Sequence, residues 1–148
     1  MKAFVKSLFV VLALAPLMAH ADMPGAHPAY LHALTDLRHA RAHLEKPAKP
    51  QVAWDEGVAI KAVDEAIREI KEAAIDDGKP LQDHPPVDAG LDHVGRLHRA
   101  IELLRKAKKD IEEKESNDFA HGLRGRAVGH IDRAIHFTEQ GIANNRQR

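Results

Sequence analysis

Residues 34–44 read LTDLRHARAHL, and residues 101–111 read IELLRKAKKDI. In both stretches the apolar residues return every three or four positions, which is the spacing of one face of an α-helix. A shift of 67 positions places Leu34 on Ile101 and keeps the two apolar patterns in register. The sequence therefore predicts two amphipathic helices that occupy equivalent places in a repeated unit.

A second pair of stretches, residues 57–67 (GVAIKAVDEAI) and 125–135 (GRAVGHIDRAI), repeats after 68 positions. The change of one position between the two shifts falls in a connecting loop, where an insertion is tolerated. We therefore expect two copies of a helical hairpin, about 28–77 and about 88–144. Each copy has one apolar stripe that it cannot bury alone. Together they predict an all-α fold, an antiparallel four-helix bundle that forms one domain over residues 22–148.

Helix-starting and helix-stopping residues predict where the four helices begin and end. The expected helices run from Pro28 to about Lys46, from about Gln51 to Asp77, from near Asp88, and from Ser116 or Asn117 onwards. Asp88 is expected to cap the third helix, because a carboxylate accepts hydrogen bonds from the free N–H groups of a first turn. The residues expected in the core are Tyr30, Leu34, Leu37, Ala40, Leu44, Ala59, Ile60, Val63, Ile67, Ile70, Ala74, Val94, Leu97, Ala100, Ile101, Leu104, Ala107, Ile111, Leu123, Ala127, Val128, Ile131, Ala134, Ile135 and Ile142.

Four charged residues occupy repeated positions at the edge of the apolar stripes. Arg41 and Lys108 are equivalent in the first pair of helices, and Asp64 and Asp132 are equivalent in the second. We expect them to form structural ion pairs that link the helices, of small energetic value where exposed.

Three glycines in the last predicted helix, Gly122, Gly125 and Gly129, follow one another at spacings of three and four. Glycine costs a helix about 1 kcal/mol relative to alanine. Two interpretations stay open: close approach of a neighbouring helix or ligand to this side, or a weak first half of the helix.

The N-terminal stretch has the organisation of a secretory signal peptide. Lys2 and Lys6 give it a positive start, residues 8–18 are almost continuously apolar, and Ala19 and Ala21 are the small residues of a cleavage site. The apolar run is shorter than the roughly 20 residues that a membrane-spanning helix needs. We therefore predict that residues 1–21 are cleaved and that the product is periplasmic or secreted, with no membrane insertion after cleavage.

Composition excludes several classes of function. The chain has 148 residues, a formal net charge of zero and no cysteine. Without cysteine it forms no disulfide, thiolate nucleophile or iron–sulfur cluster. Without a basic excess, no nucleic-acid partner is predicted. After residue 21 the serine and threonine residues are Ser116, Thr35 and Thr138, and none lies in a nucleophile motif. The chain is therefore predicted not to be an enzyme, and metal-assisted hydrolysis is the one enzymatic chemistry left available.

The sharpest candidate site is a stripe of four metal-ligating residues on the first helix. His32, Asp36, His39 and His43 follow one another at spacings of four, three and four, which places them on one side of the helix. Imidazole and carboxylate ligands suit Zn²⁺, Cu²⁺ or Ni²⁺. On a helical wheel the stripe lies roughly 130° from the centre of the apolar face, so we expect it to face solvent or the edge of the bundle. The alternative is an ordinary solvated polar face.

Two other functions remain open beside weak transition-metal binding. Ten histidines follow residue 21 and, since free histidine has a pKa of about 6.5, they make a pH-responsive stress or chaperone-like protein the alternative. The connection at residues 75–88, rich in Asp and Pro, is read either as turn chemistry or as a contact surface for an exported protein partner.

Residues 27–38 (HPAYLHALTDLR), 76–88 (DDGKPLQDHPPVD) and 95–100 (GRLHRA) resemble a group of small exported bacterial helical-bundle proteins of unknown function. The resemblance spans most of the chain after residue 21. It implies a helical, exported product, and it implies no activity and no residue role.

Overall fold

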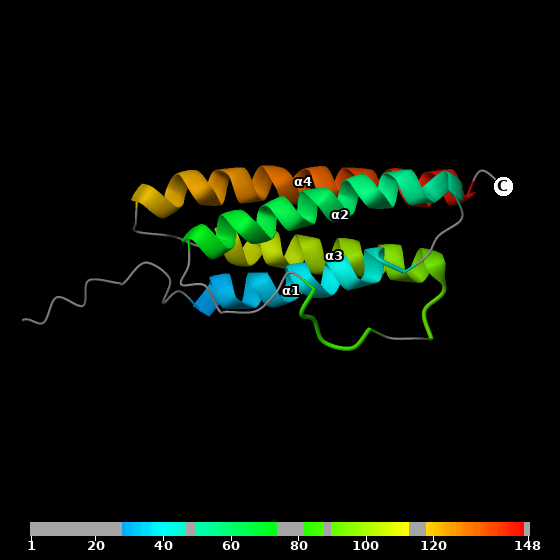
Figure 1. Ribbon diagram of the computed structural model, residues 1–148, viewed down its shortest axis with the longest axis horizontal. Helices are drawn as coiled ribbons and strands as arrows, with labels where there is room; N and C mark the ends of the chain where they lie inside the picture. Colours follow the sequence, from blue (N-terminus) through cyan, green and yellow to red (C-terminus); the bar gives the residue numbers. More distant parts are fainter. Residues whose placement is uncertain (1–27, 47–49, 74–81, 88–89, 113–117, 147–148) are drawn as a thin grey trace, which may run out of the picture.

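A computed structural model of the chain describes residues 28–46, 50–73, 82–87, 90–112 and 118–146 (Figure 1). Within these residues the chain forms four α-helices and no strand: α1 (Pro28–Leu44), α2 (Pro50–Ala73), α3 (His93–Glu112) and α4 (Asp118–Arg146). The predicted all-α class is therefore confirmed for the described part of the chain.

The four helices pack side by side as a bundle. α1 contacts α2 and α3, and α4 contacts the same two helices, so that α1 and α4 lie diagonally opposite each other. The colours in Figure 1 show that each helix runs antiparallel to both of its neighbours. The helices are therefore arranged as the predicted antiparallel four-helix bundle.

The connection between α2 and α3 has to return along the length of the bundle. Nε2 of His93, at the start of α3, lies 3.1 Å from Oε1 of Glu56, near the start of α2, so both helices begin at the same end. The described part of the connection, residues 82–87, lies beside α1 (Figure 1). There His84 and Arg38 line the same cavity, of about 260 Å³. The connection therefore covers a side of α1 that no other helix covers.

Apolar burial holds the helices together. Every predicted core residue that the structure describes is buried or half-buried, and only Ala74 lies outside the described residues. The core consists almost entirely of Leu, Ile and Ala, and the small alanines allow the helices to approach closely. The hydrophobic effect, which favours the removal of these apolar faces from water, is the main driving force for assembly of the bundle.

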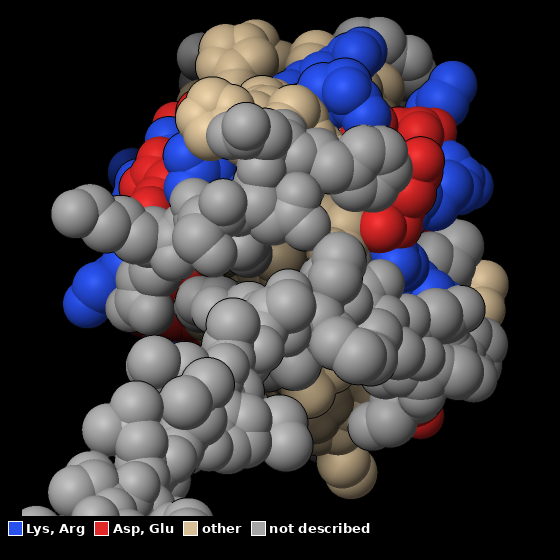
Figure 2. Space-filling view, turned by 90° about the vertical axis from the view of Figure 1, so that its left-hand side faces the viewer, with Lys and Arg blue, Asp and Glu red and all other residues tan. Residues whose placement is uncertain are grey.

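The predicted ion pairs between helices are present at both repeated positions. Nε of Arg41 lies 2.6 Å from Oδ1 of Asp64, and Nζ of Lys108 lies 2.7 Å from Oδ1 of Asp132. Figure 2, which views the end where α2 finishes and α4 begins, shows basic and acidic side chains next to one another on the described surface. On the described surface of this end, charges of both signs therefore lie beside each other.

The helix ends differ from the predicted ones in two places. α1 finishes at Leu44, close to the expected Lys46, but the predicted start of the third helix near Asp88 is wrong, because α3 begins at His93. The cap is Asp92, whose Oδ1 accepts a hydrogen bond of 2.6 Å from the backbone N–H of Gly95. The predicted end of the second helix at residues 74–77 and the predicted caps at residues 116 and 117 lie outside the described residues.

The three glycines of α4 are not in contact with another of the described helices. Gly122, Gly125 and Gly129 are exposed, and a Cβ built on Gly125 or Gly129 would meet nothing within 4 Å. A Cβ on Gly122 would meet only the guanidinium of Arg126, at 3.8 Å. The expectation of a close helix contact is therefore wrong, since this side of α4 faces away from the other helices.

None of the helices in the described ranges combines the length and the apolarity that a bilayer crossing requires.

Candidate functional site

The structure buries most of the stripe that the helical wheel placed at the surface. His32 is exposed, but Asp36 is 7% exposed, His43 is 2% exposed and His39 is half-buried. Of the two places expected for the stripe, exposure to solvent is therefore wrong for Asp36 and His43 and only partly met by His39. The reason is tertiary, since α3 packs against α1 and residues 82–87 lie beside it.

Asp36 forms an ion pair with the neighbouring helix. Its Oδ2 lies 2.8 Å from Nζ of Lys106 on α3. The carboxylate in turn raises the pKa of the Lys106 amine, mainly by accepting its hydrogen bond. Metal coordination by this carboxylate would therefore compete with a formed ion pair between α1 and α3.

The imidazoles of His39 and His43 stack on each other. Their ring centroids are 5.0 Å apart and the ring planes are inclined by 29°. Within the ranges that the structure describes, no three His, Asp or Glu side chains are placed to hold a metal ion together. The structure thus pairs two of the four predicted ligands, and a metal site at His32, Asp36, His39 and His43 stays a prediction from their spacing.

The surroundings of His39 favour its neutral form. Burial lowers the pKa of His39 below the ordinary histidine value, the positive charges of Arg99 and His84 lower it further, and Asp36 opposes them. Nε2 of His39 is also buried without a hydrogen-bond partner in the described structure. A proton taken up by this ring would therefore enter a poorly solvated and already positive environment.

A second group of ionisable residues, absent from the sequence-based candidates, is buried near the start of α2. Asp55 is 5% exposed and Glu56 is 4% exposed, so two adjacent carboxyl groups lie almost entirely out of water. Nδ2 of Asn144, on α4, donates a hydrogen bond of 2.7 Å to Oδ2 of Asp55. Glu56 contacts the imidazole of His93 on α3, as described above.

Glu56 is the most perturbed carboxyl of this group. Burial raises the pKa of Glu56 to about 7, with Arg96 opposing the increase and Asp55 adding to it. The spacing could have revealed the burial, because Asp55 and Glu56 precede the core residue Ala59 by four and three positions and so share its helix face.

Both groups lie toward the same end of the bundle, where α1 finishes and α2 and α3 begin (Figure 1). Arg96 and Arg99, one turn apart on α3, act on Glu56 and His39 respectively. This end therefore brings together Glu56, whose pKa burial raises to about 7, and His39, whose pKa burial lowers.

Comparison of the chain with protein-family models, with curated proteins and with solved structures gives no match.

Proposed function

We propose that the protein is a non-enzymatic, exported helical bundle that responds to pH, and that the response begins where α1 packs on α3. The observation that carries this proposal is the stacking of His39 on His43, a ring with 2% of its surface exposed. Two adjacent histidines in such a place couple proton uptake to the packing of the helix that holds them.

Protonation of His39 would place a positive charge on a half-buried ring that stacks at 5.0 Å on the buried imidazole of His43. The pKa of His39 is lowered, so its contribution to stability is present above the ordinary histidine value of about 6.5 and is lost as the pH falls through the folded value. The expected response to acid is therefore a loosening of α1 from α3.

Glu56 contributes with the opposite sign. Because its pKa is raised to about 7, its contribution to stability is complete below 4.5, the ordinary value for glutamate, and is lost as the pH rises through 7. Protonation of Glu56 therefore stabilises the same end of the bundle that protonation of His39 weakens. The response to acid would then be local to α1 rather than a collapse of the whole fold.

The exported and non-enzymatic parts of the proposal rest on the sequence. Residues 1–21 have the pattern of a cleaved signal peptide, and the mass of the exported protein tests whether it begins at Asp22. The hydroxyls of Thr35 and Thr138 donate hydrogen bonds to carbonyls of their own helices, to Leu31 and Ala134, which agrees with a structural role.

We also propose that the bundle is built from two duplicated hairpins. The support is the equivalence of its ion pairs, Arg41 with Asp64 and Lys108 with Asp132, at positions that the internal repeat superimposes.

The test compares wild type with His39→Gln in urea unfolding at pH 7.5 and pH 5. Glutamine removes the titration and keeps a polar side chain at this half-buried position. We expect His39→Gln to gain stability over wild type at the lower pH, relative to their difference at the higher pH. The protection of the amide groups of α1 in wild type, relative to their intrinsic exchange rate at each pH, should fall over the same interval, with smaller changes in α2 and α4.

His32→Gln is the matched control, because His32 lies on the same helix and is exposed. Its stability is expected to follow wild type within about 0.5 kcal/mol at both pH values. The proposal fails if the stability of His39→Gln depends on pH in the same way as that of wild type, or if the amide protection of α1 does not change.

A further inference from the structure

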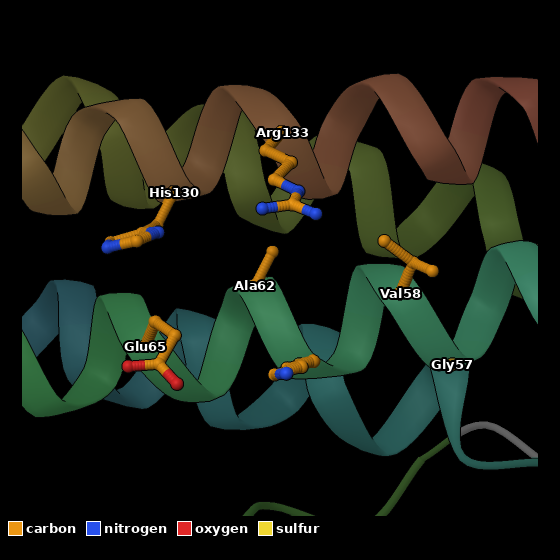
Figure 3. Close-up of a pocket in the computed structure, with 7 residues that line it drawn as sticks. Gly57, Val58, Ala62, Glu65, His130 and Arg133 are labelled. Carbon is orange, nitrogen blue, oxygen red and sulfur yellow. The ribbon is translucent and has the colours of Figure 1, made fainter.

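A groove between α2 and α4 lies apart from the ionisable groups described above. Its volume is about 490 Å³, within the range of small-molecule sites. Figure 3 shows His130 and Arg133 projecting from α4 toward α2. The α2 side contributes Val58, half-buried, and Ala62, 4% exposed, as an apolar floor.

The charges around the groove are unbalanced in favour of cations. Lys61 and Arg133 both line it, and neither has an ion-pair partner among the described residues. The single carboxylate of the lining, Glu65, accepts a hydrogen bond of 2.6 Å from Arg68, and it also interacts electrostatically with Lys61 and His130. The groove therefore combines an apolar floor with two cations, one carboxylate that already pairs with Arg68, and the imidazole of His130.

The guanidinium of Arg133 contacts an aromatic ring of its own helix. Its Cζ lies 5.8 Å from the ring centroid of Phe137, within the range of a cation–π contact. The planar guanidinium can also bind a carboxylate or a phosphate through two parallel hydrogen bonds. Arg133 is thus the better suited of the two cations to an anionic ligand.

We propose that this groove binds an amphipathic organic anion, a molecule with one carboxylate, sulfonate or phosphate group on a short apolar body. Lys61 and Arg133 would contact the anionic group, and Val58 and Ala62 the apolar body. This proposal goes beyond the pH response and does not depend on it, because its cations keep their charge at pH 8, where free histidine is neutral.

The test is calorimetric titration of the purified protein with octanoate at pH 8. We expect saturable binding with a dissociation constant of about 1 mM or tighter, and binding of neutral 1-octanol at least about tenfold weaker. Lys61→Glu with Arg133→Glu should weaken octanoate binding at least about tenfold. Lys109→Glu, a single charge reversal at an exposed position on α3, should leave it unchanged.

A steric variant keeps the test decisive if charge reversal prevents folding. Gly57 lines the groove and a Cβ there would meet nothing within 4 Å, so Gly57→Met adds a flexible side chain at the groove from a position with room for its Cβ. It should weaken octanoate binding at least about threefold. Gly125→Met is the control, since Gly125 is the repeat-equivalent glycine, is also open and lies outside the groove lining.

The proposal is overturned if wild type shows no saturable octanoate binding, or if 1-octanol binds as tightly as octanoate. It is also overturned if both the charge-reversed and the Gly57→Met proteins bind octanoate as wild type does. These results leave the response of α1 to acid untouched, so the two proposals fail separately.

Discussion

Replacing Glu56 by glutamine should make the protein more stable at alkaline pH. Glutamine resembles a protonated glutamate in size and hydrogen bonding, but it never carries the negative charge. Glu56 is 4% exposed and contacts His93 at 3.1 Å, so in wild type the ionised carboxylate is held almost entirely out of water. Glu56→Gln removes that cost and retains the packing of the side chain.

The magnitude follows from the pKa. An increase in the pKa of Glu56 from 4.5 to about 7, at about 1.4 kcal/mol per unit, corresponds to about 3 kcal/mol above pH 7. The raised value means that the wild-type protein recovers this energy as the pH falls, because the folded state takes up its proton first. We therefore expect Glu56→Gln to exceed wild type by about 2–3 kcal/mol at pH 8 and by less than about 1 kcal/mol at pH 5.

The assay is urea unfolding followed by far-UV circular dichroism at both pH values, with Glu139→Gln as the control. Glu139 also sits in an ion pair between helices, with Arg105 at 3.0 Å, but its side chain is 50% exposed. An exposed pair contributes about 0–1 kcal/mol, so the control should show a small difference that does not change sign with pH. Equal stability of Glu56→Gln and wild type at pH 8, or a difference that is the same at both pH values, would refute the reasoning.

Two further predictions concern stability at neutral pH, both measured as free energies of urea unfolding. Gly129→Ala should stabilise the protein by about 0.5–1 kcal/mol, because a Cβ there meets nothing within 4 Å and alanine favours the helix. Gly95→Ala should give no such gain, since its Cβ would meet the capping carboxylate of α3 at 2.9 Å and disturb that hydrogen bond. Lys106→Ala should cost about 1 kcal/mol by leaving the buried carboxylate of Asp36 unpaired, a value between those of exposed and buried pairs. A loss of the same size for Lys109→Ala, at an exposed position on the same helix, would contradict that explanation.

The helices and the core were predictable because they depend on local spacing. Leu34, Leu37 and Leu44 recur at helical intervals, and the same residues are buried in the bundle. The ion pair between Arg41 and Asp64 was also predictable, because the internal repeat indicated which charges occupy equivalent positions. Sequence spacing predicts burial wherever the position of a residue on its own helix decides whether it is buried.

The environment of the histidine stripe was not predictable in the same way. A helical wheel describes one helix, and it places His43 away from the centre of the apolar face, although the structure buries this residue. It contains no information on the segment at residues 82–87, which lies beside α1 although it is about forty residues away in sequence. Burial of Asp36 beneath Lys106 of α3 depends in the same way on which helices become neighbours.

The contact of Glu56 with His93 required the topology as well. Two helices that are diagonal in the bundle meet here only because both begin at the same end and carry long side chains. The sequence could show that Asp55 and Glu56 share a face with Ala59, and hence that they are buried. It could not show which group on another helix would meet them.

The contributions of Glu56 and His39 to stability change with pH in opposite directions, and this leads to a distinct expectation for the wild-type protein. Between pH 7 and 4.5 the Glu56 contribution rises as the pH falls, while the His39 contribution falls from about pH 6.5 downwards. In the interval where both titrate, each changes the free energy of unfolding by up to about 1.4 kcal/mol per pH unit, and the two changes oppose each other. Global stability should therefore vary little over this interval even while α1 loosens. In Glu56→Gln the free energy of unfolding should fall as the pH falls, because nothing then opposes the contribution of His39. In His39→Gln the free energy of unfolding should rise as the pH falls. If the free energy of unfolding depends on pH in the same way in Glu56→Gln and His39→Gln, then these two groups do not determine the response to pH at this end of the bundle.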